Sequence, residues 1–377
     1  MVKSVGIITM HRVPNCGSAL QAYALQYVIE RMGLQVELID YIYPNAYHKQ
    51  VAAKRNKTVR GNMVIRFISK LYSQVNGCFI ISLFQPFYKK FYKLSERKYT
   101  SQEEIFANPP KYDYYVSGSD QIWNPMYVGQ DTSFMLSFVR EGKRIAYSSS
   151  IAKKEIPTEY CKPYTDCLKK FDAIAVREEL SCKLVRKLTG KDVRFVLDPS
   201  LLLPAKQWEN VIRTADVNVD GRYILVYILG YSFDVYDYAA KVINHLQRNT
   251  GMKITVLIYS RANRKKLNEY KAVNKVTPAN FLSLIKNAGI VVTDSFHATA
   301  MSLNFGRPLY SLIKNKISSD NRVFSLLQSL GAEDRAISRD ESLDKLPPLE
   351  MDYSQINIRL TTKRTESINY LKLNLEI

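Results

Sequence analysis

The sequence predicts an α/β protein made of two Rossmann-like, doubly wound domains that face each other across a cleft. The chain has 377 residues, which is more than one ordinary hydrophobic core accommodates. Short apolar segments typical of buried strands alternate with segments of helical periodicity, up to residue 198 and again from residue 223. Between these two stretches, residues 199–221 mix prolines with polar residues and end in Gly221, which indicates a domain change.

The first half begins with a strand–helix–strand pattern. "SVGIIT" at 4–9 is typical of a buried strand, "LQAYALQYVIERMG" at 20–33 has helical spacing and a closing glycine, and "VELIDY" at 36–41 is the next strand. Such a unit predicts parallel strands joined by a right-handed crossover. Further predicted strands lie at 112–118, 144–150, 173–178 and 193–198. We assign residues 1–205 to the N-terminal domain.

The same alternation begins again in the second half. The predicted strands are "YILVYIL" (223–229), "KITVLIY" (253–259), "IVVTD" (290–294) and "PLYSL" (308–312). The predicted helices between them are "YDYAAKVINHLQRNTG" (236–251), "PANFLSLIKNAG" (278–289) and "FHATAMSLNFG" (296–306). We assign residues 206–350 to the second domain and expect a helix in 351–377 to pack back on the first.

Basic residues are concentrated in one segment. The net charge is +19, and residues 46–100 hold 12 Lys and Arg against a single acid, Glu96. Such an insertion can bind the anionic surface of a membrane or its lipid pyrophosphates, bind nucleic acid, or form an ordinary solvated helical face. No nucleic-acid-binding signature accompanies the charge, so we expect no nucleic-acid partner and favour peripheral contact with a membrane over nucleic-acid binding.

The remaining composition is typical of a cytoplasmic protein, attached at most peripherally to the inner face of the membrane. No stretch approaches the roughly 20 apolar residues that span a bilayer, and the N-terminus lacks the features of a signal peptide. The five cysteines form no CxxC pair and the four histidines are scattered, so we expect reduced thiols and no metal site. A homo-oligomer is compatible with the sequence.

Polar turns follow several predicted strands, where an open α/β sheet presents its side chains. In "HRVPNCGSALQ", Asn15, Gly17 and Ser18 precede a helix whose first backbone N–H groups can receive an anion. The alternative is simple capping of that helix by Asn15 or Ser18.

Two further turns of the first half carry candidate ligand-binding residues. In "VSGSDQIWNP", Ser119 and Asp120 lie where sugar hydroxyls could be bound, and Trp123 offers an apolar face to a sugar ring. The alternative is an N-cap aspartate with a tryptophan in the core. In "AVREE", Arg177 ends a strand, and its planar guanidinium suits a carboxylate or phosphate, or else a surface ion pair.

The stretch "VVTDSFHATAMSLNFGRPLY" contains the strongest candidate for proton transfer. Asp294 and Ser295 end a strand, and His297 begins the next helix. An imidazole near a helix N-terminus suits proton transfer near neutral pH, although a structural hydrogen-bonding role is the alternative. Arg307, after the helix-ending Gly306, is a second cationic candidate.

Taken in order, several of these stretches resemble the polysaccharide pyruvyl transferase family over about residues 5–335. They are "NCGSALQAYAL", "YVSGSDQIWN", "AVREELS", "VLDPSLLL" and "TDSFHATAMSLNFGRP". The resemblance implies a shape similar to GT-B glycosyltransferases. It also implies transfer of pyruvate from phosphoenolpyruvate to two hydroxyls of one sugar, such as a lipid-linked oligosaccharide or glycan acceptor, with a cyclic ketal and phosphate as products. No cofactor is implied.

The resemblance also implies roles for single residues. His297 matches the motif histidine and is the general acid/base candidate, and Arg177 matches the arginine that holds the donor's anionic groups. We expect the remaining donor contacts from Asn15, Gly17, Ser18, Ser295 and Arg307, and acceptor contacts from Ser119, Asp120, Trp123 and Asp294. Some family members carry Arg-Leu before the histidine where this chain has Ser295 and Phe296, so the missing charge must come from Arg307, Arg322 or Arg12.

Two other functions stay open at this point. A GT-B-like glycosyltransferase would need a base pocket and an acidic residue for the ribose of a nucleotide sugar, and residues 221–310 offer no clear pair. A catalytically silent protein that binds an anion or a glycan is the third interpretation.

Overall fold

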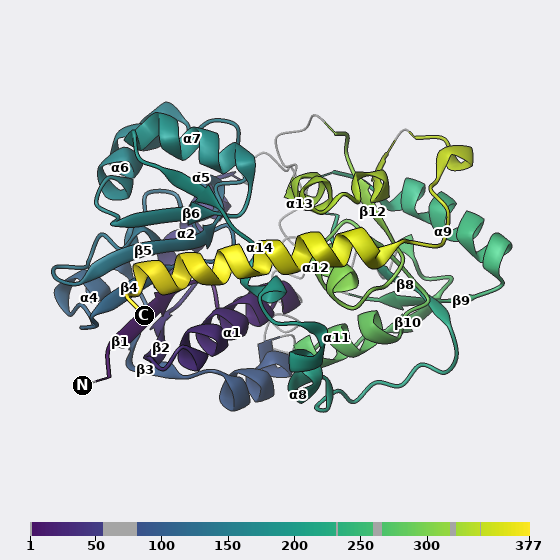
Figure 1. Ribbon diagram of the computed structural model, residues 1–377, viewed down its shortest axis with the longest axis horizontal. Coiled ribbons are helices and arrows are strands. Elements are labelled where there is room, and N and C mark those ends of the chain that lie inside the picture. Colours follow the sequence, from purple (N-terminus) through teal and green to yellow (C-terminus); the bar gives the residue numbers. More distant parts are fainter. Residues whose placement is uncertain (1, 56–80, 231–232, 259–265, 317–321, 340) are drawn as a thin grey trace, which may run out of the picture. The chain divides into compact units, whose positions relative to one another are not determined.

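The computed structural model describes residues 2–55, 81–230, 233–258, 266–316, 322–339 and 341–377 (Figure 1). The chain forms two units, which are described separately. Unit 1 comprises Met1–Pro199 and Ser367–Ile377, and unit 2 comprises Ser200–Glu366. Each unit contains one parallel sheet with helices in the connections, which confirms the predicted α/β class with two doubly wound domains.

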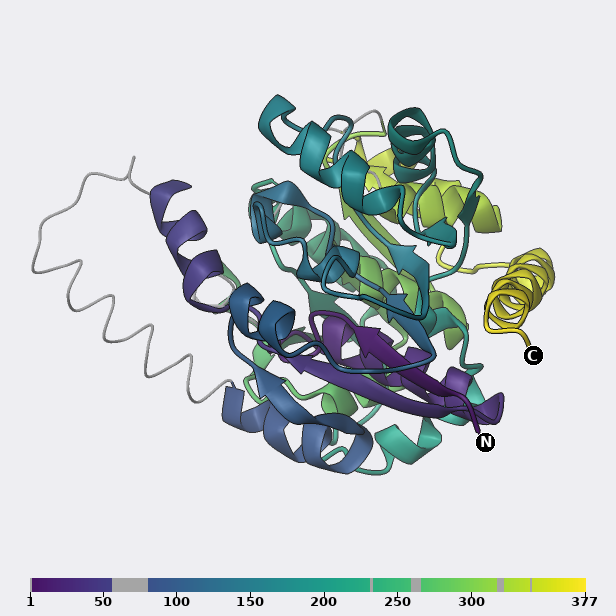
Figure 2. The same ribbon diagram turned by 90° about the vertical axis from the view of Figure 1, so that its left-hand side faces the viewer.

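The sheet of unit 1 has seven strands in the order β3-β2-β1-β4-β5-β6-β7, all parallel. In Figure 2 its first strand, drawn in purple, begins near the label N. The strands are β1 (Ser4–Ile8), β2 (Gln35–Tyr41), β3 (Leu94–Tyr99), β4 (Tyr114–Ser117), β5 (Lys143–Ser149), β6 (Ala173–Val176) and β7 (Val193–Phe195). The order reverses between β1 and β4. Ligands of such sheets bind outside the carboxyl ends of the strands at this switch point.

Helices and a large apolar core accompany the sheet of unit 1. The helices include α1 (Cys16–Arg31), α2 (Ala46–Arg55), α4 (Gln102–Ala107), α5 (Pro125–Val128), α6 (Thr158–Leu168) and α7 (Glu179–Thr189), and residues 81–91 are also helical. The core includes the fully buried rings of Trp123, Phe134 and Phe171. Within the basic segment, Leu94–Tyr99 forms β3, the edge strand of the sheet, while residues 56–80 lie outside the described residues. Contact of the basic segment with a membrane therefore stays a prediction.

The sheet of unit 2 has six parallel strands in the order β10-β9-β8-β11-β12-β13. The strands are β8 (Tyr223–Tyr227), β9 (Lys253–Leu257), β10 (Lys271–Val273), β11 (Ile290–Thr293), β12 (Leu309–Ile313) and β13 (Ala336–Ser338). The helices are α8 (Glu209–Ile212), α9 (Tyr236–Thr250), α11 (Pro278–Asn287), α12 (Phe296–Asn304) and α13 (Arg322–Leu330). The switch point of this sheet lies between β8 and β11.

The last helix, α14 (Tyr353–Asn374, yellow in Figure 1), begins in unit 2 and ends in unit 1. In unit 2, Arg364 Nε donates to Leu201 O at 2.8 Å. In unit 1, Ser367 Oγ accepts from Leu197 N at 3.0 Å, and the Tyr370 hydroxyl donates to Ala146 O at 3.0 Å. Beyond the helix, the carboxylate of Glu376 accepts hydrogen bonds from the side chains of Lys3, Tyr114 and Lys143. The chain end is thus hydrogen-bonded into the sheet of unit 1.

No helix among the described residues is both long enough and apolar enough to cross a bilayer.

Candidate active site

At the switch point of unit 1, the turns that follow β1 and β4 are joined by hydrogen bonds. Thr9 Oγ1 donates to Ser119 O at 2.9 Å, and Ser119 N donates to Gln21 Oε1 at 3.0 Å. Ser18 Oγ donates to Asp120 Oδ2 at 2.5 Å. These bonds connect residues about a hundred positions apart and fix the turn that carries Ser119 and Asp120.

The backbone of that turn is tightly packed. Gly118 has a φ of 144°, and a Cβ at this position would lie 1.8 Å from Tyr147 O, so only glycine fits. Asp120 has a φ of 79°, which is uncommon for a residue with a side chain. Ser119 is fully buried, and its Oγ donates to Ser148 O at 2.6 Å. Ser119 and Asp120 were both expected to contact the acceptor sugar. Of the two, only Asp120 keeps part of its surface exposed.

Arg177, at the carboxyl end of β6, lies in a buried cluster of carboxylates. Its Nη1 donates to Asp198 Oδ2 at 2.9 Å, and its Nη2 donates to Asp120 Oδ1 at 3.2 Å. The side chains of Arg177 and Asp198 are 0% exposed, whereas that of Asp120 is 12% exposed. The ion pair is thus buried, which differs from the surface pair that the sequence allowed. Asp198 is a member that sequence reasoning missed, although the stretch "VLDPSLLL" contains it.

The first predicted turn caps its helix and does not expose its amide groups. Asn15 Oδ1 accepts from Gly17 N at 2.9 Å and from Ser18 N at 3.2 Å. A side-chain oxygen thereby satisfies two of the first amide groups of α1, as an N-cap does. The expected donor contacts of Asn15, Gly17 and Ser18 are therefore corrected: these groups bind one another, and the Ser18 hydroxyl binds Asp120.

Trp123 belongs to the core of unit 1. Its side chain is fully buried, its ring lies edge-on to Phe171 with centroids 5.6 Å apart, and its Nε1 donates to Phe134 O at 3.3 Å. The expected contact between its ring and a sugar is corrected accordingly, because burial in the core is the alternative that the structure supports.

Arg12, one candidate for the missing donor charge, is already ion-paired. Its Nε and Nη2 donate to the two oxygens of Asp40 at 2.5 and 2.6 Å, and His11 Nε2 lies 3.2 Å from Asp40 Oδ1. Burial alone would raise the pKa of Asp40, but the hydrogen bonds from His11 and Arg12 outweigh it and hold that pKa well below its usual range. The guanidinium of Arg12 therefore forms a bidentate ion pair with Asp40.

At the switch point of unit 2, Asp294 connects the loops that follow β8 and β11. Its Oδ1 accepts from Leu229 N at 2.6 Å and its Oδ2 accepts from Gly230 N at 2.7 Å. Burial raises the pKa of Asp294, although these two N–H donors oppose that shift. Each carboxylate oxygen binds a backbone amide, so Asp294 braces the edge of the site, and its contact with the acceptor stays a prediction.

His297 lies directly beside this brace, in the first turn of α12. Ser295 is the N-cap of that helix, and its Oγ accepts from Ala298 N at 3.4 Å. Its expected contact with the donor stays a prediction. His297 is 9% exposed, and the ring of Phe296 lies edge-on to it with centroids 5.3 Å apart. The imidazole is thereby held at the carboxyl edge of the sheet, near the positive end of the helix dipole.

Arg307 lies beyond the C-terminal end of α12, at the amino edge of the sheet of unit 2, whereas His297 lies at the carboxyl edge. The nine residues of α12 span about 13 Å, and Arg307 follows them just before β12 begins. Its backbone carbonyl accepts from the Tyr353 hydroxyl at 2.6 Å. The expected donor contact of Arg307 beside His297 is therefore corrected. Cationic residues on the connections at the carboxyl edge include Lys314, Arg322 and Arg339.

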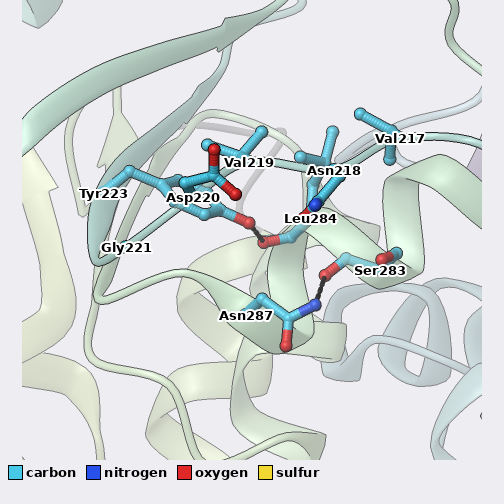
Figure 3. Close-up of a pocket in the computed structure, with 9 residues that line it drawn as sticks. All are labelled: Val217, Asn218, Val219, Asp220, Gly221, Tyr223, Ser283, Leu284 and Asn287. Atoms are coloured by element: carbon cyan, nitrogen blue, oxygen red, sulfur yellow. Dashed lines mark hydrogen bonds between the residues drawn. The ribbon is translucent and has the colours of Figure 1, made fainter.

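A pocket of about 400 Å³ in unit 2 also lies at the amino edge (Figure 3). It is lined by residues 217–221, by Tyr223 and by Ser283, Leu284 and Asn287 of α11. The Tyr223 hydroxyl donates to Leu284 O at 2.7 Å, and Asn287 Nδ2 donates to Ser283 O at 3.0 Å. Because β8 begins at Tyr223 and His297 follows the carboxyl end of β11, this pocket is not part of the candidate site.

Within the described parts of the chain, no three or more His, Cys, Asp or Glu side chains are grouped so that they could hold a metal ion.

A model of the polysaccharide pyruvyl transferase family matches residues 15–313, a range that includes the turn after β4 and the loops at the switch point of unit 2. The chain belongs to this family. The comparison with curated proteins yields no match.

Solved structures similar to this pyruvyl transferase family member support its fold. The UDP-GlcNAc 2-epimerase of Methanocaldococcus jannaschii is 13% identical with a TM-score of 0.53, and the match covers 100% of each chain. A Listeria monocytogenes protein assigned as a UDP-N-acetylglucosamine 2-epimerase is 10% identical with a TM-score of 0.53, and the match covers 98% of this chain and 90% of that one. These likenesses fit the expected GT-B-like fold, and at such identities they show the fold alone.

Proposed function

We propose that this protein transfers pyruvate from phosphoenolpyruvate to two hydroxyls of one sugar in a surface polysaccharide precursor, such as a lipid-linked oligosaccharide. The observation that carries the proposal is the position of His297 in a chain of this family. Its imidazole lies in the first turn of α12, at the carboxyl end of β11 and beside the switch point of the sheet. This is where an open α/β sheet binds its ligands.

The proposed reaction needs one group that both gives and takes protons. Protonation of C3 of the donor makes C2 electrophilic, and the first sugar hydroxyl adds to C2. The second hydroxyl then displaces phosphate, which closes the cyclic ketal. Of the two hydroxyl protons, one ends in the new methyl group and the other on the released phosphate. A histidine at neutral pH can serve both transfers, and we assign this role to His297.

The donor carries a carboxylate and a phosphate, so its site requires positive charge. We propose that this charge comes from the edge of unit 2 that carries His297. The first turn of α12 has the positive end of the helix dipole, and Lys314, Arg322 and Arg339 lie on connections at the same edge. Arg307 lies at the opposite edge and Arg12 is paired with Asp40, so neither is needed for this role.

The decisive experiment uses the purified full chain, phosphoenolpyruvate and a panel of lipid-linked saccharides. Mass spectrometry of the saccharides should show the added pyruvate, and phosphate should be released only when an acceptor is present. A nucleotide sugar as the only productive donor would instead support the alternative, a GT-B-like glycosyltransferase, for which the fold similarity is the sole support. Absence of turnover with either donor would favour a silent binding protein.

His297→Gln tests the assigned histidine. Turnover should fall at least about 100-fold, the lower range for a lost general acid/base, while the thermal midpoint stays unchanged. His245→Gln is the matched control, because His245 lies on α9 and contacts Asn249 one helical turn away. Near-normal turnover of His297→Gln would remove the imidazole from the mechanism.

A further inference from the structure

Tyr47, in the first turn of α2, presents a partly exposed aromatic ring in a fixed position. The residue is 38% exposed, and its hydroxyl accepts a hydrogen bond from Gln130 N at 2.6 Å. Because the hydroxyl oxygen accepts this bond, its own proton can be donated to an oxygen atom of a ligand. Tyr47 thus offers an apolar ring face and a hydrogen-bond donor side by side.

Gly129 makes the contact between Tyr47 and its loop possible. A Cβ on Gly129 would lie 2.6 Å from the hydroxyl oxygen of Tyr47, and the φ of Gly129 is 59°. A side chain at this position would therefore displace the tyrosine and strain the backbone. The position of the ring depends on this glycine.

A buried hydrogen-bond network holds the first turn of α2. His48 Nε2 lies 2.9 Å from Asp131 Oδ2, and both side chains are 1% exposed. The same carboxylate oxygen accepts from the Tyr41 hydroxyl at 2.5 Å. Asn45 joins the two, because its Nδ2 donates to the Tyr41 hydroxyl at 3.2 Å and its Oδ1 accepts from His48 N at 3.3 Å. These contacts connect α2 with the end of β2 and with the loop after α5, so the ring of Tyr47 is oriented before any ligand binds.

Tyr47 lies at the ligand-binding edge of the sheet of unit 1. α2 follows β2, whereas Gly129 and Gln130 follow β4 and α5. β1 lies between β2 and β4, so a contact between these two connections is made on the carboxyl side of β1. That strand borders the switch point, where open α/β sheets bind their ligands.

Two further exposed side chains adjoin the same loop. Met126 and Tyr127 lie in α5, which contacts α2 and ends just before Gly129, and they are 38% and 37% exposed. We call Tyr47, Met126 and Tyr127 the tyrosine face. Aromatic and apolar side chains that gather at the ligand-binding edge of a sheet are typical of a binding site.

We propose that the tyrosine face binds a pyranose ring of the acceptor glycan. This inference rests on the proposed function, because it assigns part of unit 1 to the acceptor of that reaction. A pyranose has an apolar face of C–H groups and a rim of hydroxyls, which matches an aromatic face with an adjacent hydroxyl donor. Tyrosine also provides such contact area at a low cost in conformational entropy. The fixed hydroxyl of Tyr47 favours a sugar over a lipid chain, because a lipid chain offers no acceptor for its proton.

The test measures glycoside binding by the full chain in the absence of the donor. Saturation-transfer NMR titrations use methyl β-D-galactopyranoside, methyl β-D-glucopyranoside and methyl α-D-mannopyranoside as probes. Tyr47→Ala should weaken binding of the preferred glycoside about fivefold or more, as is typical of a truncated aromatic contact. Tyr47→Phe keeps the ring and removes the hydroxyl, so its loss of affinity should be about twofold to fivefold.

Gly129→Ala keeps Tyr47 but places a methyl group against its hydroxyl, so it should weaken glycoside binding as well. If this variant fails to fold, the two Tyr47 variants decide the question. Phe106→Ala is the matched control, because Phe106 is a 37% exposed ring on α4 of the same unit, and it should leave glycoside affinity unchanged. Phosphoenolpyruvate affinity, measured by calorimetry, should stay within about twofold in every variant, as expected for separate sites.

Full glycoside affinity in Tyr47→Ala, or in a folded Gly129→Ala, would overturn the inference, as would absence of glycoside binding by the unmodified protein. Equal loss of glycoside and phosphoenolpyruvate affinity in Tyr47→Ala would show a merely structural role. Weaker sedimentation of Tyr47→Ala with phosphatidylglycerol vesicles, with glycoside binding unchanged, would assign the tyrosine face to lipid and would also overturn the inference.

The outcome is separable from that of the proposed function. Glycoside binding that depends on Tyr47, without phosphate release from phosphoenolpyruvate, would support this inference while contradicting the proposed reaction. Phosphate release that requires an acceptor, together with glycoside binding that is insensitive to Tyr47, would have the opposite meaning.

Discussion

Truncation of Trp123 tests whether its ring is part of the core or a platform for a sugar ring. The burial of the ring sets the expected loss of thermal stability. Its ring is fully buried against Phe171, and its indole N–H donates to Phe134 O. Truncation of such a side chain to alanine costs about 3–5 kcal/mol. In a domain of 150–250 residues, about 1 kcal/mol shifts the thermal midpoint by about 2–4 °C. Trp123→Ala should therefore lower the midpoint of unit 1 by about 6–20 °C.

The assay is differential scanning calorimetry, which can resolve the transitions of two units. Trp208→Ala is the matched control, because Trp208 is equally buried but belongs to unit 2, so that variant should shift the other transition. Trp123→Phe keeps most of the ring volume and should lower the midpoint much less. A midpoint of Trp123→Ala within about 2 °C of the unmodified protein, with weaker binding of the acceptor, would refute the placement of this ring in the core.

Three further predictions address a cap, the chain end and an excluded cation. Asn15→Ala removes the N-cap of α1 and should cost about 1 kcal/mol, a decrease of about 2–4 °C in the midpoint of unit 1 by calorimetry; no shift would show that the cap is dispensable. Hydrogen bonds from Lys143, Tyr114 and Lys3 lower the pKa of Glu376 to about 2, below its unfolded value of about 4.3. The contribution of Glu376 to folding stability is therefore fully present above about pH 4.3 and is lost as the pH falls toward 2. The midpoint of Glu376→Gln should accordingly be lower than that of the unmodified protein at pH 7, and the two should converge near pH 2; a constant gap would contradict this linkage. Arg307→Ala should leave turnover within about twofold, because Arg307 lies at the edge opposite His297; a tenfold loss in steady-state assays would restore it to the site.

The central strands could be predicted from the sequence because their composition alone defines them. "IVVT" of β11 and "YILVY" of β8 are apolar without interruption, as expected for parallel strands buried on both faces. β3 escaped prediction because its residues, "LSERKY", form an edge strand with three consecutive exposed positions. Charged residues are typical of edge strands, and in a basic segment they conceal the strand. β10 and β13 have three residues each and are followed closely by polar or charged residues, so no longer apolar segment marks them in the sequence.

The turns of the site could also be predicted, but the direction of their side chains could not. A polar residue after a strand marks the ligand-binding edge of a sheet whatever it contacts. Whether its oxygen faces a ligand or a backbone amide depends on turns that are distant in the sequence. Asp120 and Asp294 follow equivalent strands of the two units. Asp120 binds the side chains of Ser18 and Arg177 as well as the amide of Gln121, whereas Asp294 binds the amides of residues 229 and 230. Only the folded chain distinguishes them.

The shared helix α14 has a practical consequence for dividing this protein. A shortened unit 1 that stops at Pro199 would lose three hydrogen-bonding groups of the terminal segment. These are the Ser367 hydroxyl, which accepts from Leu197 N, the Tyr370 hydroxyl, which donates to Ala146 O, and the carboxylate of Glu376. Those losses would strip polar partners from three neighbouring regions at once. A shortened unit 1 should instead carry a short linker from Pro199 to residues 367–377, so that the terminal segment is restored in the same chain.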